Sequence, residues 1–412
     1  MAAHGITELR GPAEPAPLAA YADYADYAEE LFGHLPRADQ RRWAQAYLQG
    51  LLTTPGKKSV RRLAAAVSTS PTASQSLQQF INASPWEWEP ARGELMRWVE
   101  ERAPVRAWTV APAVLPKRGD HSVGVHRRFV PSAGRTVNCQ VALGLFLSVP
   151  GHNVPVDWRL FLPDHWADDT GLRRRTRIPD GVRHRPLWAD TLDLVGAAAA
   201  RTSLAAVPVV ADMTELPSAA PLVSGLSQRG YDFLVAVPDG MQVIADGHLK
   251  AQPAAHAAAA ASTLSARSFL AMSSRRHPHT ATVTASDGRQ RMLRIVSGLV
   301  RVPGVRTGTG APHRTYRLFA EWQADEQRPS VVWLTSMVQT RMSDLLTLTR
   351  LRAGSAATVH SLREHLGLLD FEGRSFPGWH HHMTLVSAAY AYSRLAGLAQ
   401  RSEPLGLTRR TA

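Results

Sequence analysis

Clustered cations are the residues whose type and spacing most directly suggest a chemistry. Lys57, Lys58, Arg61 and Arg62 fall on about one helical turn, where they could contact a phosphate backbone. A solvated charged face is the alternative interpretation. Other candidate DNA contacts, again in local clusters, are Lys117, Arg118, Arg127, Arg128, Arg173, Arg174 and Arg175.

The charge of the whole chain also favours a polyanionic partner. Its 412 residues include 47 Lys and Arg against 34 Asp and Glu, which gives a net charge of +13. The first 35 residues hold six acidic residues and one Arg, so this segment carries −5 and the remainder carries +18. Such a surplus attracts nucleic acid and releases its counterions. A composition set by a high-GC genome is the alternative explanation.

Histidine and cysteine favour structural roles. The run His380 to His382 suggests a metal site, but consecutive helical residues point about 100° apart and rarely share one ion. The single cysteine, Cys139, excludes an intramolecular disulfide and a multi-cysteine metal site, which fits a reducing cytoplasm. We find no nucleophile elbow and no phosphate-binding glycine loop. We also expect no membrane span and no secretion signal.

Hydrophobic periodicity divides the chain into helical, mixed and β-rich parts. Helices are expected at 22–32, 38–52, 60–67, 74–80 and 91–99, and strands at 106–110, 138–149, 157–162, 204–211 and 231–237. Four further strands are expected at 280–284, 291–302, 313–321 and 330–336, followed by helices at 343–351, 355–368 and 383–396. The predicted fold class is therefore mixed α+β.

We expect six segments along the chain. They are a disordered tail at 1–18, an α-helical DNA-binding domain at 19–103, the first part of an α/β core at 104–239, a β-rich insertion at 240–338, the C-terminal helices of the core at 339–398, and a tail at 399–412.

Several blocks of sequence, in the same order, resemble the DDE transposases of one class of bacterial insertion sequences. The blocks are residues 115–125 (LPKRGDHSVGV), 134–142 (GRTVNCQVA), 155–163 (PVDWRLFLP) and 367–385, with residues 47–51 and 80–86 in the helical part. The match spans roughly residues 20–396. It implies an RNase H-like core, interrupted by the β-rich insertion, behind an α-helical DNA-binding domain.

The resemblance also implies a catalytic centre that this chain has largely lost. Such enzymes cut and join DNA with two Mg²⁺ ions held by two Asp and one Glu, because hard cations take oxygen ligands. Asp212 matches the second Asp. Ala111 and Pro112 stand at the first acidic position, and Ala356 and Ala357 stand where the family has glutamate. One carboxylate cannot hold two Mg²⁺ ions.

Four other acidic residues were weighed as replacements. Asp120 follows the first strand in a loop, and Asp168 and Asp169 mimic the missing motif in composition only. Glu364 lies two helical turns beyond Ala357, about 11 Å along a helix axis. We expect none of them to restore the centre.

The sequence therefore predicts a transposase-derived protein that binds double-stranded DNA, lacks nuclease activity and acts by occupying DNA. It would work in the cytoplasm at the nucleoid, as a homodimer if it follows the family, with no membrane contact or small-molecule substrate. No cofactor is expected. Mg²⁺ or Mn²⁺ would be needed only if nuclease activity remains. The alternatives are an active transposase with relocated acidic ligands and a protein-interaction scaffold.

Overall fold

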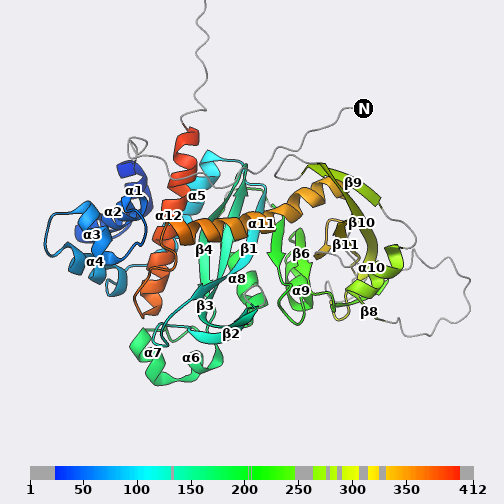
Figure 1. Ribbon diagram of the computed structural model, residues 1–412, viewed down its shortest axis with the longest axis horizontal. Coiled ribbons are helices and arrows are strands. Elements are labelled where there is room, and N and C mark those ends of the chain that lie inside the picture. The colour runs from blue at the N-terminus through cyan, green and yellow to red at the C-terminus, as the bar shows by residue number, and fades with distance from the viewer. Residues whose placement is uncertain are drawn as a thin grey trace, which may run out of the picture.

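The computed structural model describes residues 24–130, 134–202, 204–205, 207–245, 263–274, 279–284, 290–305, 314–323 and 331–399. The tails expected at 1–18 and 399–412 lie outside these ranges, apart from Ala399. Within them, five N-terminal helices precede a large mixed sheet whose far end is formed by the expected β-rich insertion (Figure 1).

The N-terminal part is all helical, as its periodicity predicts. Its helices are α1 (Tyr24–Phe32), α2 (Ala38–Thr53), α3 (Val60–Val67), α4 (Ala73–Asn82) and α5 (Trp88–Arg102). Leu48, Leu63 and Leu77 from three of them are fully buried together in one core. One expectation is wrong: Lys57 and Lys58 precede α3, so the four clustered cations do not share a helical turn.

The central strands have the RNase H-like arrangement. They are β1 (Ala107–Pro116), β2 (His126–Val130), β3 (Arg135–Val149), β4 (His152–Leu160), β5 (Val209–Asp212) and β6 (Phe233–Val237). The order β4-β3-β1-β5-β6 combines antiparallel β1/β3 and β3/β4 pairs with parallel β1/β5 and β5/β6 pairs. The short strand β2 pairs with the first residues of β3 and forms an edge.

Strand alternation assigns the two faces of this sheet to different helices. Val210, Leu234 and Ala236 pack with Leu345 and Leu346 of α11 (Met342–His365). The alternate residues of β5 and β6 join the larger core, which includes α8 (Leu187–Arg201) and α9 (Ala220–Gln228). In Figure 1, α11 lies across the sheet.

Helix α11 corrects the prediction of two helices with a break near residue 353. The expected gap at 352–354 is absent, and the helix is continuous through Gly354. A Cβ atom at Gly354 would lie 2.8 Å from Nδ2 of Asn153 on β4. That amide donates to the carbonyl of Leu351 at 2.7 Å and to Oγ of Ser355 at 2.9 Å. Glycine therefore allows close approach of strand and helix rather than a turn.

The insertion extends the core sheet instead of forming a separate layer. Its elements are β7 (Gln242–Ala245), β8 (Leu264–Ser265), α10 (Ala266–Ser274), β9 (His279–Thr284), β10 (Gln290–Arg301), β11 (Tyr316–Gln323) and β12 (Val332–Thr335). Strand β12 pairs antiparallel with β6, so the sheet runs on through β12, β11 and β10. The four strands expected between 280 and 336 are all present.

The last helix, α12 (Phe376–Ala399), joins the N-terminal helices to the core. It packs against α2, α4, α5 and β4. Arg92 of α5 is buried beneath it, and its guanidinium donates to Asp157 of β4 at 2.6 Å and to Oγ1 of Thr384 at 2.8 Å. The remaining helices, α6 (Asp164–Asp168) and α7 (Thr170–Thr176), form a small lobe after β4.

Candidate active site

Asp212 is the last residue of β5, a strand that lies between β1 and β6. Its side chain points to the face covered by α11, because Val210 two residues earlier packs there. Oδ1 accepts hydrogen bonds from the backbone N of Thr214 at 3.1 Å and from its Oγ1 at 2.7 Å. Oδ2 accepts one from Nε of Arg352 at 2.5 Å. Both carboxylate oxygens therefore already have donors.

On α11, where the resemblance places a glutamate, the side chain that meets Asp212 is an arginine. Ala356 and Ala357 lie on α11 and are exposed. Arg352 lies one turn before Ala356, about 6 Å along the axis. The Arg352 side chain is 37% exposed and that of Asp212 is 17% exposed, so the ion pair is partly shielded from water.

The first acidic position carries no ionisable group. Val110 pairs with Ala211 in the parallel register, which places Ala111 beside Asp212 at the next position. Ala111 is buried. The next residue, Pro112, pairs only with β3, because β5 ends at Asp212. A strand tolerates proline where one side has no hydrogen-bonding neighbour.

These positions border a small hollow of about 70 Å³. It holds two acidic and two basic side chains. Asp212 pairs with Arg352, and Glu215 pairs with Arg128 at 3.0 Å. The other residues that line it are Pro112, Leu143, Leu187, Met213, Thr214 and Leu216. Each carboxylate in the hollow is thus neutralised by a guanidinium group.

The hollow does not fit a two-metal centre. Two Mg²⁺ ions need several oxygen ligands that converge and are free to coordinate. Within the described ranges, no group of three or more His, Cys, Asp or Glu side chains is arranged to hold a metal ion. The donor set at Asp212 is one carboxylate whose oxygens bond to a hydroxyl, an amide and a cation.

The four acidic residues considered as replacements lie away from this hollow. Asp120 accepts a hydrogen bond from Asn138 at 3.1 Å. Asp169 caps α7, where Oδ1 accepts from the backbone N of Gly171 at 2.7 Å, and these hydrogen bonds hold its pKa below the usual value. Asp168 is on α6, and Glu364 is near the end of α11, three turns beyond Arg352. None of the four lines the hollow.

Several predicted DNA contacts are engaged within the protein. Lys58 is buried, its ammonium donates to the carbonyl of Thr54, and burial lowers its pKa to about 8. Lys57 pairs with Glu372 at 2.9 Å. Lys117 donates to the carbonyl of Phe371 at 3.0 Å, and burial lowers its pKa.

Two of the predicted arginines have structural partners as well. Arg173 donates to the carbonyls of Ala167, Pro179 and Val182 and so fixes the turn after α7. Arg128 faces the hollow.

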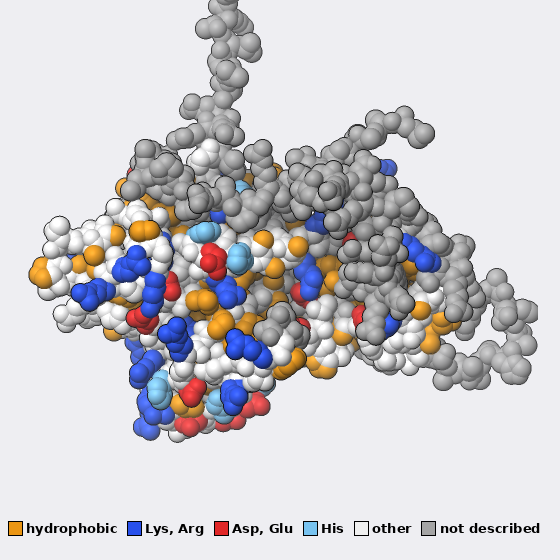
Figure 2. All heavy atoms as spheres, viewed as in Figure 1, with side chains coloured by type: hydrophobic (Ala, Val, Ile, Leu, Met, Phe, Trp, Pro, Cys, Tyr) orange, Lys and Arg blue, Asp and Glu red, His pale blue; other side chains and the backbone are white. Residues whose placement is uncertain are grey.

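The remaining predicted cations face solvent. Arg62 is exposed and donates to the carbonyl of Pro55 at 2.7 Å. Five others are exposed, and their side chains form no salt bridge or hydrogen bond with another described residue: Arg61, Arg118, Arg127, Arg174 and Arg175. On the face shown in Figure 2, Lys and Arg side chains gather over the N-terminal helices and over the lobe of α6 and α7.

The histidine run is part of the core. His380 accepts from Arg92, and His382 lies 3.0 Å from the hydroxyl of Tyr47. The ring of His381 stacks on Trp86 with centroids 3.9 Å apart. Burial lowers the pKa of His381 to about 4 and that of His382 to about 3.

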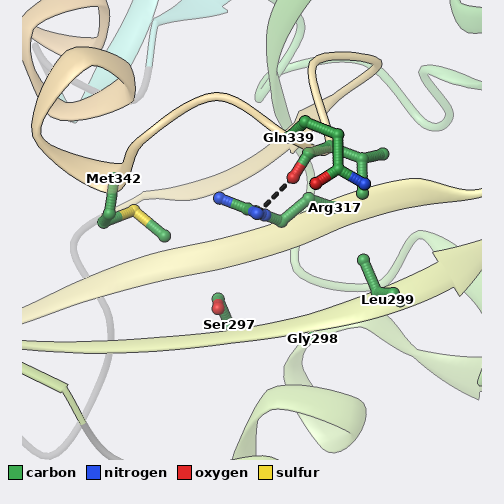
Figure 3. A pocket seen from close by; sticks show the side chains of 7 residues that line it. Ser297, Gly298, Leu299, Arg317, Gln339 and Met342 are labelled. Carbon is green, nitrogen blue, oxygen red and sulfur yellow. Dashed lines mark hydrogen bonds between the residues drawn. The ribbon is translucent and has the colours of Figure 1, made fainter. Parts of the chain in front are cut away.

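A larger hollow of about 400 Å³ lies at the insertion, between β10, β11 and the segment before α11 (Figure 3). Its lining includes Ser297, Arg317 and Gln339 but no carboxylate. The guanidinium of Arg317 donates to the carbonyls of Val338 and, at 2.9 Å, of Thr340. The residues that line this hollow therefore offer no carboxylate ligand for a metal ion.

Sequence reasoning missed Arg352, Thr214 and Glu215. Arg352 lies one turn before the position aligned with glutamate, so helical spacing from Ala356 could have identified it. The pairing of Arg128 with Glu215 joins segments 87 residues apart, and nothing in the local sequence indicates it.

Comparisons with known proteins identify a similar solved structure and a matching family. One similar solved structure is the cryo-EM structure of a piggyBac transposase synaptic complex with hairpin DNA. The match covers 97% of this chain and 80% of the transposase chain, at 12% sequence identity and a TM-score of 0.41. No curated protein sequence matches. The family model of the DDE superfamily endonucleases matches residues 30–298, well over half of the sequence. The chain belongs to the DDE superfamily endonuclease family.

Proposed function

We propose that this protein is a DNA-binding derivative of a DDE transposase that has no metal-dependent nuclease activity and acts by occupying double-stranded DNA. We further propose that it works in the cytoplasm at the nucleoid as a homodimer. No described helix is both long and apolar enough to cross a membrane.

The pairing of Asp212 with Arg352 carries the proposal that the site is inactive. A metal ion would have to displace a guanidinium that already bonds to Oδ2 at 2.5 Å. It would then find no second carboxylate at Ala111 or Ala356 to complete its coordination. The guanidinium neutralises the charge of Asp212, which is the electrostatic part of what a bound cation does.

The distribution of cations supports DNA as the partner. Arg61 lies on α3, Arg118 in the loop after β1, Arg127 on β2, and Arg174 and Arg175 on α7. All five are exposed. Phosphate contacts of this kind supply affinity without sequence information and weaken as salt rises.

The test combines DNA binding and DNA cleavage on one preparation. Binding to a DNA duplex is measured at about 50 mM and about 200 mM salt, where six or more phosphate contacts cost roughly 10³-fold in affinity. Strand cleavage of the same duplex is measured with Mg²⁺ and with Mn²⁺. We expect salt-sensitive binding and no cleavage.

Matched variants assign the result to the proposed surfaces. Arg61→Ala should weaken binding and reduce the salt dependence by about one counterion, whereas Arg229→Ala, at the end of α9, removes the same charge elsewhere. Metal-dependent cleavage that Asp212→Ala abolishes would refute the inactive site. Binding that is absent at low salt would refute DNA as the partner.

A further inference from the structure

One large apolar side chain is exposed among the cations of the edge strand β2. Phe129 is 59% exposed. The exposed Arg127 lies two residues earlier on the strand, so both side chains point to the same face. The partner of Phe129 across the antiparallel pair is Thr136, which is also exposed. An aromatic ring thus stands uncovered at the end of the β2–β3 hairpin.

A second exposed cation, Arg118, lies beside the same face of the hairpin. Asn138, the cross-strand partner of Arg127, donates to the carbonyls of Lys117 at 3.3 Å and Gly119 at 3.2 Å. These bonds hold the loop that carries the exposed Arg118 against this face. Asp120 is the one acidic residue that this network includes, through its hydrogen bond with Asn138.

The opposite face of the hairpin belongs to the former active site. Arg128 lies between Arg127 and Phe129 and points the other way, into the hollow that contains Asp212. Arg135, the cross-strand partner of Val130, is exposed at the hairpin end. Phe129 therefore faces away from the hollow, and DNA that contacts the exposed Arg127 on that face of the strand would also meet Phe129.

We propose that Phe129 is a stacking platform for an unpaired base of the bound DNA. A single exposed apolar residue is ordinary by itself, but this one is an aromatic ring with the exposed cations Arg127 and Arg135 beside it. Every nucleobase has a π-face, so stacking requires no particular sequence. Pairing of the β2 edge with a second copy is opposed by the like charges of Arg127 on β2 and of Arg135 on the neighbouring strand β3.

The inference rests on the proposed DNA binding, and the experiment separates the two. Affinity is measured for a paired duplex and for the same duplex with one unpaired 2-aminopurine, whose fluorescence falls when it stacks on an aromatic ring. We expect tighter binding and quenching with the unpaired base. Phe129→Ala should remove roughly fivefold or more of that preference and restore the fluorescence. Paired-duplex binding should be retained, and Phe129→Trp should keep both effects.

Met272→Ala is the matched control, because Met272 is a similarly exposed apolar side chain on α10. If the wild type binds both DNAs equally and without quenching, the stacking platform is refuted while DNA binding stands. If it binds neither DNA, the proposed function fails and the platform with it. A change of oligomeric state in Phe129→Ala, with no change in base preference, would assign the ring to contact between copies and refute the inference.

Discussion

Replacement of Arg92 by methionine should strongly destabilise the joint between the N-terminal helices and the core. The Arg92 side chain is 1% exposed and donates five hydrogen bonds. They reach Thr384 and His380 on α12 and Asp157 and Trp158 on β4. Methionine fills a similar volume but donates none of them.

The cost follows from the carboxylate that Arg92 neutralises. Burial alone would raise the pKa of Asp157, but neighbouring guanidinium groups hold it below its usual value, so the group is ionised at neutral pH. Without Arg92, the described residues that still compensate the buried charge are Arg201, at 3.0 Å, and the charge of Arg159. Breaking one partner of a buried ion pair costs about 3–5 kcal/mol. Against a typical total stability of about 5–15 kcal/mol, this loss is large.

Urea-induced unfolding, followed by tryptophan fluorescence, measures this cost. Arg97→Met is the control on the same helix, because the Arg97 side chain is 54% exposed and pairs only with Glu94. An exposed pair of this kind contributes about 1 kcal/mol or less. If Arg92→Met lowered the free energy of unfolding no more than Arg97→Met, the buried network would not be what joins the two parts.

Three further predictions concern the pH dependence of stability, a buried lysine and a tightly packed glycine. Burial lowers the pKa of His381 to about 4 and that of His382 to about 3, whereas unfolded histidine titrates near 6.5. Between these folded and unfolded pKa values the unfolded chain binds more protons than the folded one, so the free energy of unfolding is largest above about pH 6.5 and falls at lower pH. A melting temperature that does not fall from pH 7 to pH 5 would contradict this. Lys58→Met should leave DNA affinity in a gel shift unchanged, because the ammonium is buried, and a marked loss would show that it reaches DNA. Gly225→Ala should destabilise by roughly 1–3 kcal/mol in urea, because its Cβ would lie 2.3 Å from a leucine methyl group. Gly196→Ala should not destabilise the protein in this way, because there is open space around Gly196. If both substitutions lowered the free energy of unfolding equally, the packing argument would be refuted.

The elements of the fold were largely predictable because their signals are local. Apolar spacing located all five N-terminal helices and four of the six described strands of the insertion, β9 to β12, but not β7 and β8. It erred between residues 351 and 355, where α11 runs on without a break and Gly354 lies against Asn153. It also erred on Lys57 and Lys58, which precede α3, because the backbone N of Lys58 donates to Asp370, a residue far away in the sequence.

The sequence by itself determined which acidic residues are present at the site, since the identities of Ala111, Pro112, Asp212, Ala356 and Ala357 can be read directly. Only the tertiary structure decided what replaces them. Whether a cation is free to meet DNA or is committed to a carboxylate depends on segments far apart in the chain. Arg352 reaches Asp212 across 140 residues because α11 crosses the end of β5. Charge is a property of composition, whereas the partner of each charge is a property of the fold.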